Sequence, residues 1–141
     1  MQHGAAKVEW GDLMTRVIVI LCCLIAWHFV VDWMFQSEEQ AKAKAISIES
    51  CLLHVLIYTL AFAPVAALLL FYALDWSAAS ILTFVAVNSG LHLLIDNGIY
   101  VWNKWAWEND PKRKYLLPVV VLDEVFHVGV LLMTFLSLQV M

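Results

Sequence analysis

The sequence is short of charged residues, which make up 14% of the chain, whereas soluble domains carry about 25%. This scarcity excludes a surface that is solvated on all sides. Cysteine is also rare, and Cys22, Cys23 and Cys51 fit no zinc spacing, because adjacent cysteines on a helix point apart. We therefore expect neither a disulfide framework nor a thiolate metal site.

Most of the chain consists of apolar residues. They form 63% of the 141 residues, give a mean hydropathy of +0.81, and gather into four long blocks. The blocks run over residues 17–35, 51–73, 79–102 and 115–138. About 18–20 apolar residues span a bilayer as a helix, and a helix satisfies its own backbone in lipid. The sequence thus predicts an all-α fold, an integral membrane four-helix bundle, with residues 1–141 in a single transmembrane domain.

The basic residues predict how these helices are oriented. Six of the eight lie in the two longer connections, residues 36–50 and 103–114, whereas the short turn at 74–77 carries none. Cytoplasmic loops are enriched in Lys and Arg. We therefore expect the longer loops in the cytoplasm and both termini outside.

Histidines interrupt the apolar blocks, one in each: His28, His54, His92 and His127. Three blocks also hold an aspartate four residues from the histidine, which gives the pairs His28/Asp32, His92/Asp96 and Asp123/His127. Residues four apart share one face of a helix. Each pair can therefore present two ligands to one point.

The order within the pairs agrees with the alternating direction of the helices. The first and third helices run inward and read His-x-x-x-Asp, whereas the fourth runs outward and reads Asp-x-x-x-His. At a rise of about 1.5 Å per residue, every aspartate then lies about one turn closer to the cytoplasm than its histidine. His54 enters at the level of the aspartates, so that all of these side chains fall in one half of the bilayer.

Buried charge of this kind needs a reason, because an ionised aspartate at the centre of a membrane helix costs roughly 2.5–3.5 kcal/mol. A divalent metal supplies one, since it binds ionised carboxylate and neutral imidazole together. The ligands exceed what one tetrahedral ion needs and suit two ions bridged by carboxylate. Nitrogen and oxygen donors without a thiolate fit zinc, manganese or iron and do not choose among them. We expect one or two divalent ions, with zinc first and manganese or iron as alternatives. A hydrogen-bonded polar core and a proton or ion path stay open as other interpretations.

Other polar residues have a lesser place in the pattern. Gln36 and Asn88 continue the rows of polar residues four apart on the first and third helices. Each could orient a metal ligand by a hydrogen bond or join two helices by a hydrogen bond. Glu124 is a general base, a further ligand, or a side chain that reaches the headgroups. Lys44 is expected to be solvated in its loop, and Tyr58 to pack.

These motifs resemble a family of small bacterial and phage membrane proteins, domain of unknown function 3307. Its opening His-x-x-x-Asp-x-x-x-Gln is matched by His28, Asp32 and Gln36, and its short helical loop by Ala41 and Lys44. Its later elements are matched by His54, His92, Asp96, Asp123 and His127, with Glu124 in place of the usual Gln. The resemblance implies a multi-pass protein of the bacterial inner membrane. The layout is also similar to that of inner-membrane metal-dependent hydrolases.

We therefore expect a membrane-embedded hydrolase for a lipid or other amphiphilic ester or phosphoester. Metal would lower the pKa of a bound water, and a carboxylate, Glu124 or an aspartate, would take the proton. Its partner is membrane lipid, with no nucleic acid, and Gly90 and Gly98 allow close packing within a bundle or in a homo-oligomer. The alternatives are a non-enzymatic membrane protein whose metal or polar core supports partner binding, and an ion or proton transporter.

Overall fold

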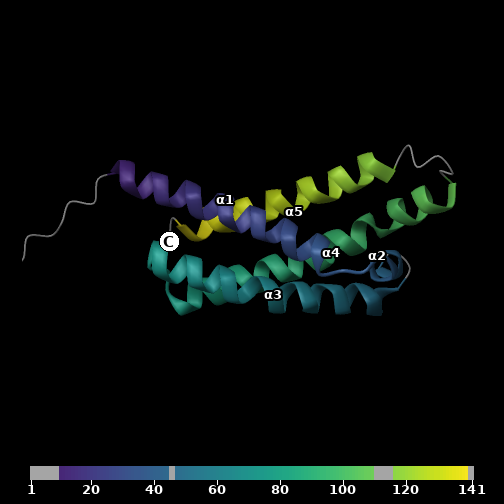
Figure 1. Cartoon of the computed structure of the whole chain (residues 1–141), viewed down its shortest axis with the longest axis horizontal. Helices are drawn as coiled ribbons and strands as arrows, with labels where there is room; N and C mark the ends of the chain where they lie inside the picture. Colours follow the sequence, from purple (N-terminus) through teal and green to yellow (C-terminus); the bar gives the residue numbers. More distant parts are fainter. Residues whose placement is uncertain (1–9, 45–46, 110–115, 140–141) are drawn as a thin grey trace, which may run out of the picture.

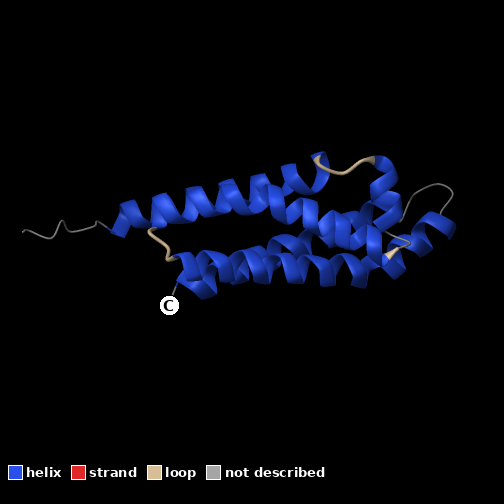
Figure 2. Cartoon of the chain, turned by 90° about the horizontal axis from the view of Figure 1, so that it is seen from below, coloured by secondary structure: helices blue, strands red, loops and turns tan. Residues whose placement is uncertain are grey.

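The computed structural model describes residues 10–44, 47–109 and 116–139 (Figure 1). Its elements are α1 (Trp10–Met34), α2 (Glu38–Lys44), α3 (Ile48–Leu74), α4 (Ala78–Asn109) and α5 (Leu116–Gln139). The described residues contain helices and short loops without a strand (Figure 2). The predicted all-α fold is confirmed.

The four long helices lie side by side as a bundle. α1 contacts α3, α3 contacts α4, α4 contacts α5, and α5 returns to α1, while the short α2 packs on α3. Each long helix contains a segment that is long and apolar enough to cross a membrane. The N-terminal end of α1 and the C-terminal end of α5 lie at the end of the bundle opposite α2 (Figure 1). The chain is thus a multi-pass helical bundle, and the side of the membrane that each end faces stays a prediction.

Two helices extend well past the predicted apolar blocks. α1 begins at Trp10 instead of residue 17, and α4 continues to Asn109 instead of ending at 102. The apolar blocks were set by the thickness of the bilayer, whereas a helix ends only where its backbone hydrogen bonds stop. Much of the predicted 103–114 connection is therefore helical.

The outer surface of the bundle is apolar. Leu60, Leu82 and Leu94 are each more than 60% exposed, and many other large apolar side chains also face outward. A soluble protein rarely exposes apolar patches of this extent. Lipid chains are the surroundings that suit this surface.

The inner surface is formed by one stripe of buried residues on each helix. On α5 the buried residues recur at every fourth position: Val119, Asp123, His127, Leu131 and Phe135. α1 repeats the pattern with Ile20, Leu24, His28 and Asp32. Because side chains four apart stack along one helix face, apolar and polar residues follow one another along the same bundle axis.

The tight turn between α3 and α4 closes the end of the bundle opposite α2. Asp75 adopts a left-handed conformation, with φ 54° and ψ 32°, and its backbone N–H donates to Leu70 O. Trp76 then turns inward, stacks on Phe135 with ring centroids 5.4 Å apart, and donates to Gln139 Oε1. This turn seals the bundle end with an aromatic side chain.

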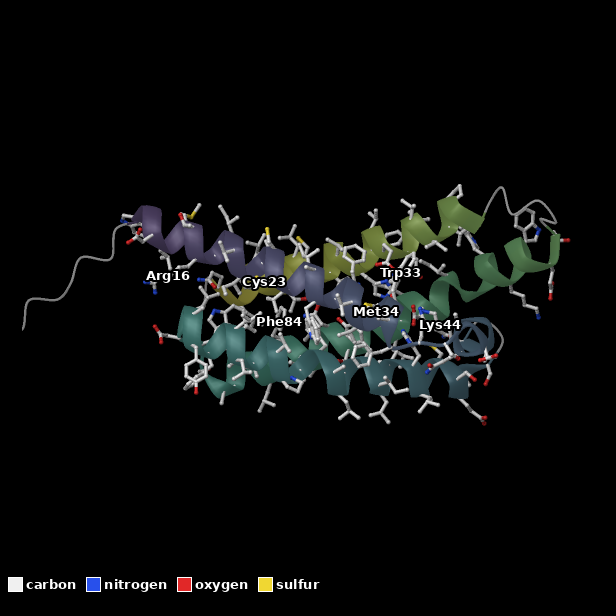
Figure 3. The ribbon with its side chains drawn as sticks, in the orientation of Figure 1. Arg16, Cys23, Trp33, Met34, Lys44 and Phe84 are labelled. Atoms are coloured by element: carbon white, nitrogen blue, oxygen red, sulfur yellow. The ribbon has the colours of Figure 1, made fainter. Side chains whose placement is uncertain are left out.

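The interior therefore has two parts. The apolar half is formed by side chains that are at most 1% exposed, namely Leu24, Phe62, Ala66, Leu70, Phe84, Leu131 and Phe135. The polar cluster lies nearer α2 and comprises His28, Asp32, His54, His92, Asp96, Asp123, Glu124 and His127. Phe84 and Lys44 mark these two regions in Figure 3.

Candidate metal centre

The four histidines and three aspartates predicted as ligands are all buried, with at most 9% of any residue exposed. They come from all four long helices and follow the stripes described above. On α1, α4 and α5 the histidine and the aspartate of each predicted pair therefore lie on the same buried face of the helix. Their role as metal ligands stays a prediction that the geometry can support or weaken.

Donor atoms of Asp32, His54 and His92, from α1, α3 and α4, converge, and a carboxylate oxygen of Asp96 lies beside the two imidazole nitrogens. His54 Nε2 lies 2.9 Å from Asp32 Oδ1 and 3.3 Å from His92 Nε2. His92 Nε2 lies 3.4 Å from Asp32 Oδ1, and both imidazole nitrogens lie 3.6 Å from Asp96 Oδ2. Ligands at about 2.0–2.2 Å from a tetrahedral ion are separated by roughly 3.3–3.6 Å. In the set Asp32, His54, His92 and Asp96, here named the inner group, the five distances given above are 2.9–3.6 Å, close to this spacing.

Two further groups adjoin the inner group. Ligand atoms of His28, Asp32 and Glu124 lie within 4.8 Å of one another, and those of His92, Asp96 and His127 do the same. Asp32 and Asp96 therefore each take part in the inner group and in one neighbour. A carboxylate shared in this way is the feature that bridges two ions in two-metal sites.

Several polar atoms of the polar cluster are buried without a hydrogen-bond partner in the described structure. They are His28 Nε2, Asp123 Oδ1, Glu124 Oε2 and His127 Nε2. Each such atom costs about 1–3 kcal/mol if it stays unsatisfied. His28 Nε2 and Glu124 Oε2 face each other across 3.6 Å, and His127 Nε2 lies 3.7 Å from Asp96 Oδ1. These atoms are too far apart for strong hydrogen bonds and suitably placed to share a cation, so the residues fit a metal.

The outer nitrogens of two imidazoles are already engaged. His127 Nδ1 donates to the backbone O of Asp123 at 3.0 Å, because a carbonyl can only accept, and in the neutral ring this leaves the lone pair on Nε2. His28 Nδ1 is hydrogen bonded to Tyr58 Oη at 2.9 Å. Hydrogen bonds of this kind orient a ligating imidazole and fix its tautomer. Both rings thus point an unpartnered Nε2 into the polar cluster.

Tyr58 has a larger part than the packing role expected from sequence. Besides bonding His28, it stacks on the His92 ring with centroids 4.2 Å apart. Tyr58 follows His54 by four residues and so lies on the same helix face. That spacing is the signal by which sequence reasoning could have assigned it to the site.

Lys44 is not solvated, so the prediction made for it is wrong. Its Nζ lies 3.4 Å from both carboxylate oxygens of Asp96, and its side chain is only 13% exposed. Burial opposes its charge, but the attraction of Asp96, and then of Asp32 and Asp123, outweighs this and raises the pKa of Lys44. α2, which packs on α3, brings this ammonium to the polar cluster. The lysine of the short helical loop in the family resemblance was the available signal.

The two neighbouring acidic residues of α5, Asp123 and Glu124, have different surroundings. Glu124 Oε1 accepts a hydrogen bond from Trp33 Nε1, while Oε2 faces His28. Asp123 lies outside the convergent groups of described residues, with Oδ1 3.3 Å from His127 Nδ1. The role of Glu124 as base and that of Asp123 as ligand stay predictions.

Gln36 and Asn88 lie at opposite margins of the site. Gln36 comes after the last residue of α1, Met34, and its buried Oε1 has no partner in the described structure. Asn88 Nδ2 donates to Phe84 O at 2.8 Å within α4. Neither side chain is hydrogen bonded to a predicted ligand in the described structure. That these residues orient a ligand stays a prediction.

Comparisons with curated proteins and with solved structures find no match to this chain. A family model, in contrast, matches residues 20–141. This segment contains every residue of the polar cluster together with Lys44 and Tyr58. The match confirms the resemblance found in the sequence, and the chain belongs to the family described as protein of unknown function, DUF3307.

Proposed function

We propose that this chain is a membrane-embedded, metal-dependent hydrolase that acts on a lipid or other amphiphilic ester or phosphoester. The observation that carries the proposal is the convergence of buried imidazole and carboxylate donors at metal-ligand spacing, several of them without another partner. The proposal includes two divalent ions. Zinc is the ion that we propose, since it accepts imidazole nitrogen and carboxylate oxygen as ligands in tetrahedral sites.

The residues divide naturally between two ions. The inner group would hold the first through Asp32, His54, His92 and Asp96. The second would lie toward α5, among His28, Glu124 and His127, whose facing atoms lack partners. The Asp32 carboxylate would be available to both ions, because it takes part in two of the convergent groups, and Asp96 would be available to the second through its group with His92 and His127.

Divalent ions held here would supply the usual chemistry of such centres, lowering the pKa of bound water and polarising the scissile group. The chain supplies the means to move a proton. Glu124 has one oxygen fixed by Trp33 and the other directed into the polar cluster. A carboxylate held in this way can take a proton from an attacking water if it is not itself a ligand.

The apolar half supports a blind site over a transport path. Beyond His28 and Tyr58 the bundle axis is closed by Leu24, Phe62, Phe84 and Phe135, which are fully buried. A proton or ion path needs polar groups or water to continue through the bilayer. A site that is closed at this end is better suited to binding and turning over a molecule from the end nearer α2.

Metal content is the first test of this proposal. Protein purified in detergent without chelator and then exposed to zinc, manganese or iron should retain about two ions per chain by elemental analysis. Asp96→Asn should lose at least one of them, whereas Asp12→Asn, an exposed carboxylate on α1, should lose none. Absence of metal from the wild-type chain under all three conditions would contradict the proposed hydrolase function.

Activity and stability separate a catalytic metal from a structural one. The metal-loaded protein is expected to hydrolyse at least one member of a panel of lipid esters and phosphoesters, and Asp96→Asn to be inactive. A purely structural ion leaves no open coordination position, and its removal unfolds the protein. Metal-loaded protein that is inert across the panel and unfolds in chelator would assign the metal to structure.

A further inference from the structure

Lys44 is the feature that a metal centre alone leaves unexplained. A metal site attracts carboxylates and imidazoles and repels an ammonium. Nevertheless, α2 places Lys44 Nζ 3.4 Å from both oxygens of Asp96, a proposed metal ligand. Only 13% of the Lys44 side chain is exposed, so this ammonium is part of the site's interior.

The charges of the site indicate what Lys44 is for. Asp32, Asp96, Asp123 and Glu124 carry four negative charges when ionised, and Lys44 carries one positive charge. Two divalent ions would cancel the carboxylates and leave Lys44 as an excess positive charge, before any bound water or substrate is counted. An uncompensated charge away from bulk water is unfavourable. The metal-loaded site is therefore complementary to an anion.

On the basis of the proposed function, we propose that Lys44 binds the phosphate group of the substrate beside the metal ions, which makes the substrate a phosphate-bearing amphiphile and not a neutral ester. The Asp96 contact is then the resting position of the ammonium. When a phosphate oxygen is present, Nζ donates to it, because a charge-assisted hydrogen bond to phosphate replaces the contact with a carboxylate that the metal now engages.

The position of Lys44 agrees with an amphiphile. α2 lies at the end of the bundle that carries the polar cluster, and the outer faces of the long helices are apolar (Figure 3). A headgroup phosphate at Lys44 would leave the acyl or isoprenoid chain against those faces. The same phosphate chemistry also occurs in soluble esters, so the test must distinguish the two sources.

The test compares phosphate binding and metal content in the same preparations. Inorganic phosphate is titrated calorimetrically into metal-loaded wild type, Lys44→Met, Lys44→Arg and Lys104→Met. Lys104 is the matched control, because it lies on α4 with 45% of its side chain exposed and pairs only loosely with Glu108 at 4.0 Å. Each preparation is also assayed for metal by elemental analysis, which shows whether the variant is loaded, and by circular dichroism, which shows whether it is helical.

We expect Lys44→Met to keep its metal and to bind phosphate about ten- to a hundredfold more weakly, the range for loss of a charged hydrogen bond. Lys44→Arg should retain most of the affinity, and Lys104→Met all of it. Equal affinity in wild type and Lys44→Met, with metal retained, would overturn this inference and leave the hydrolase proposal standing. Wild type without metal would overturn the proposed function, and lack of phosphate binding in every preparation would overturn the role of Lys44.

Displacement experiments then identify the source of the phosphate. Phosphatidic acid in mixed micelles and glycerol phosphate in solution are each used to displace bound inorganic phosphate from the wild type. Stronger displacement by the lipid supports the amphiphile. Equal or stronger displacement by glycerol phosphate overturns the lipid part of the inference.

Discussion

The two parts of the bundle interior are built by the same helices at the same spacing, yet they hold together in different ways. In the apolar half, Phe84 meets Phe62 and Phe135 with ring centroids 6.3 Å and 6.4 Å apart. In the polar cluster, two turns further along the stripes, His54 and His92 face Asp32 at 2.9 Å and 3.4 Å. The outer faces of both parts are apolar.

This difference separates stability from function. Burying apolar groups between helices brings little hydrophobic gain when the alternative is lipid, so the apolar half is held by close packing. The polar cluster brings four acidic side chains together with unpartnered imidazole nitrogens, which opposes association unless a cation is bound. We infer that the apolar half fixes the bundle and that the polar cluster is retained for what it binds.

The largest effect is expected from removing a shared carboxylate. Asp32→Asn should lose at least one metal ion per chain, because Asp32 contributes to two of the convergent groups and an amide does not replace an anionic ligand. Elemental analysis measures the loss, and Asp12→Asn is the exposed control. Full metal content in Asp32→Asn would show that Asp32 is not a ligand. It would also contradict the view that the polar cluster binds metal while the apolar half stabilises the bundle.

A cavity in the apolar half should have the opposite pattern. Phe84→Ala is expected to lower the free energy of unfolding by roughly 2–3 kcal/mol, because in lipid only the cavity term applies, while metal content at saturation stays unchanged. Leu82→Ala, which truncates a side chain that is 69% exposed to the outside, should have a much smaller effect. Denaturant titration in detergent measures both variants, and loss of metal from Phe84→Ala would show that the two parts are not independent.

A smaller effect is expected from a residue that orients a proposed metal ligand without binding the metal itself. Tyr58→Phe removes the hydroxyl that bonds His28 Nδ1 and should weaken metal binding about 10–100-fold, with little change in unfolding. Competition with a metal chelator provides the affinity. Tyr72→Phe is the matched control, since Tyr72 is 76% exposed. Equal metal affinity in both variants would reduce Tyr58 to packing.

The smallest effect is expected at the boundary between the two parts. Asn88→Leu removes a hydrogen bond to Phe84 O in the same helix and should change stability by about 1 kcal/mol or less. Metal affinity, measured by the same competition, should stay within roughly twofold, a change small beside that of ligand-orienting residues. A decrease as large as that of Tyr58→Phe would instead place Asn88 among the residues that orient a ligand.

Sequence reasoning reached much of this arrangement because its signals are local. The apolar blocks identified the four crossings, and the spacing of four residues placed His28 with Asp32 and His92 with Asp96 on common faces. Helix ends were less accessible, since α1 and α4 continue beyond the apolar blocks into polar sequence. Lys44 was misassigned because a lysine in a connection is solvated by default, and nothing local shows that α2 folds back onto the site.

The sequence by itself determined the class of protein, the four long apolar helices and the seven buried histidines and aspartates, because hydropathy and helical periodicity act within one segment. Only the tertiary structure decided which atoms meet. The approach of His54 to Asp32, the position of Glu124 beside His28 and Trp33, and the insertion of Lys44 at Asp96 all depend on how separate helices rotate and pack. Such contacts arise from the fit between helix surfaces, which no spacing along a single helix encodes.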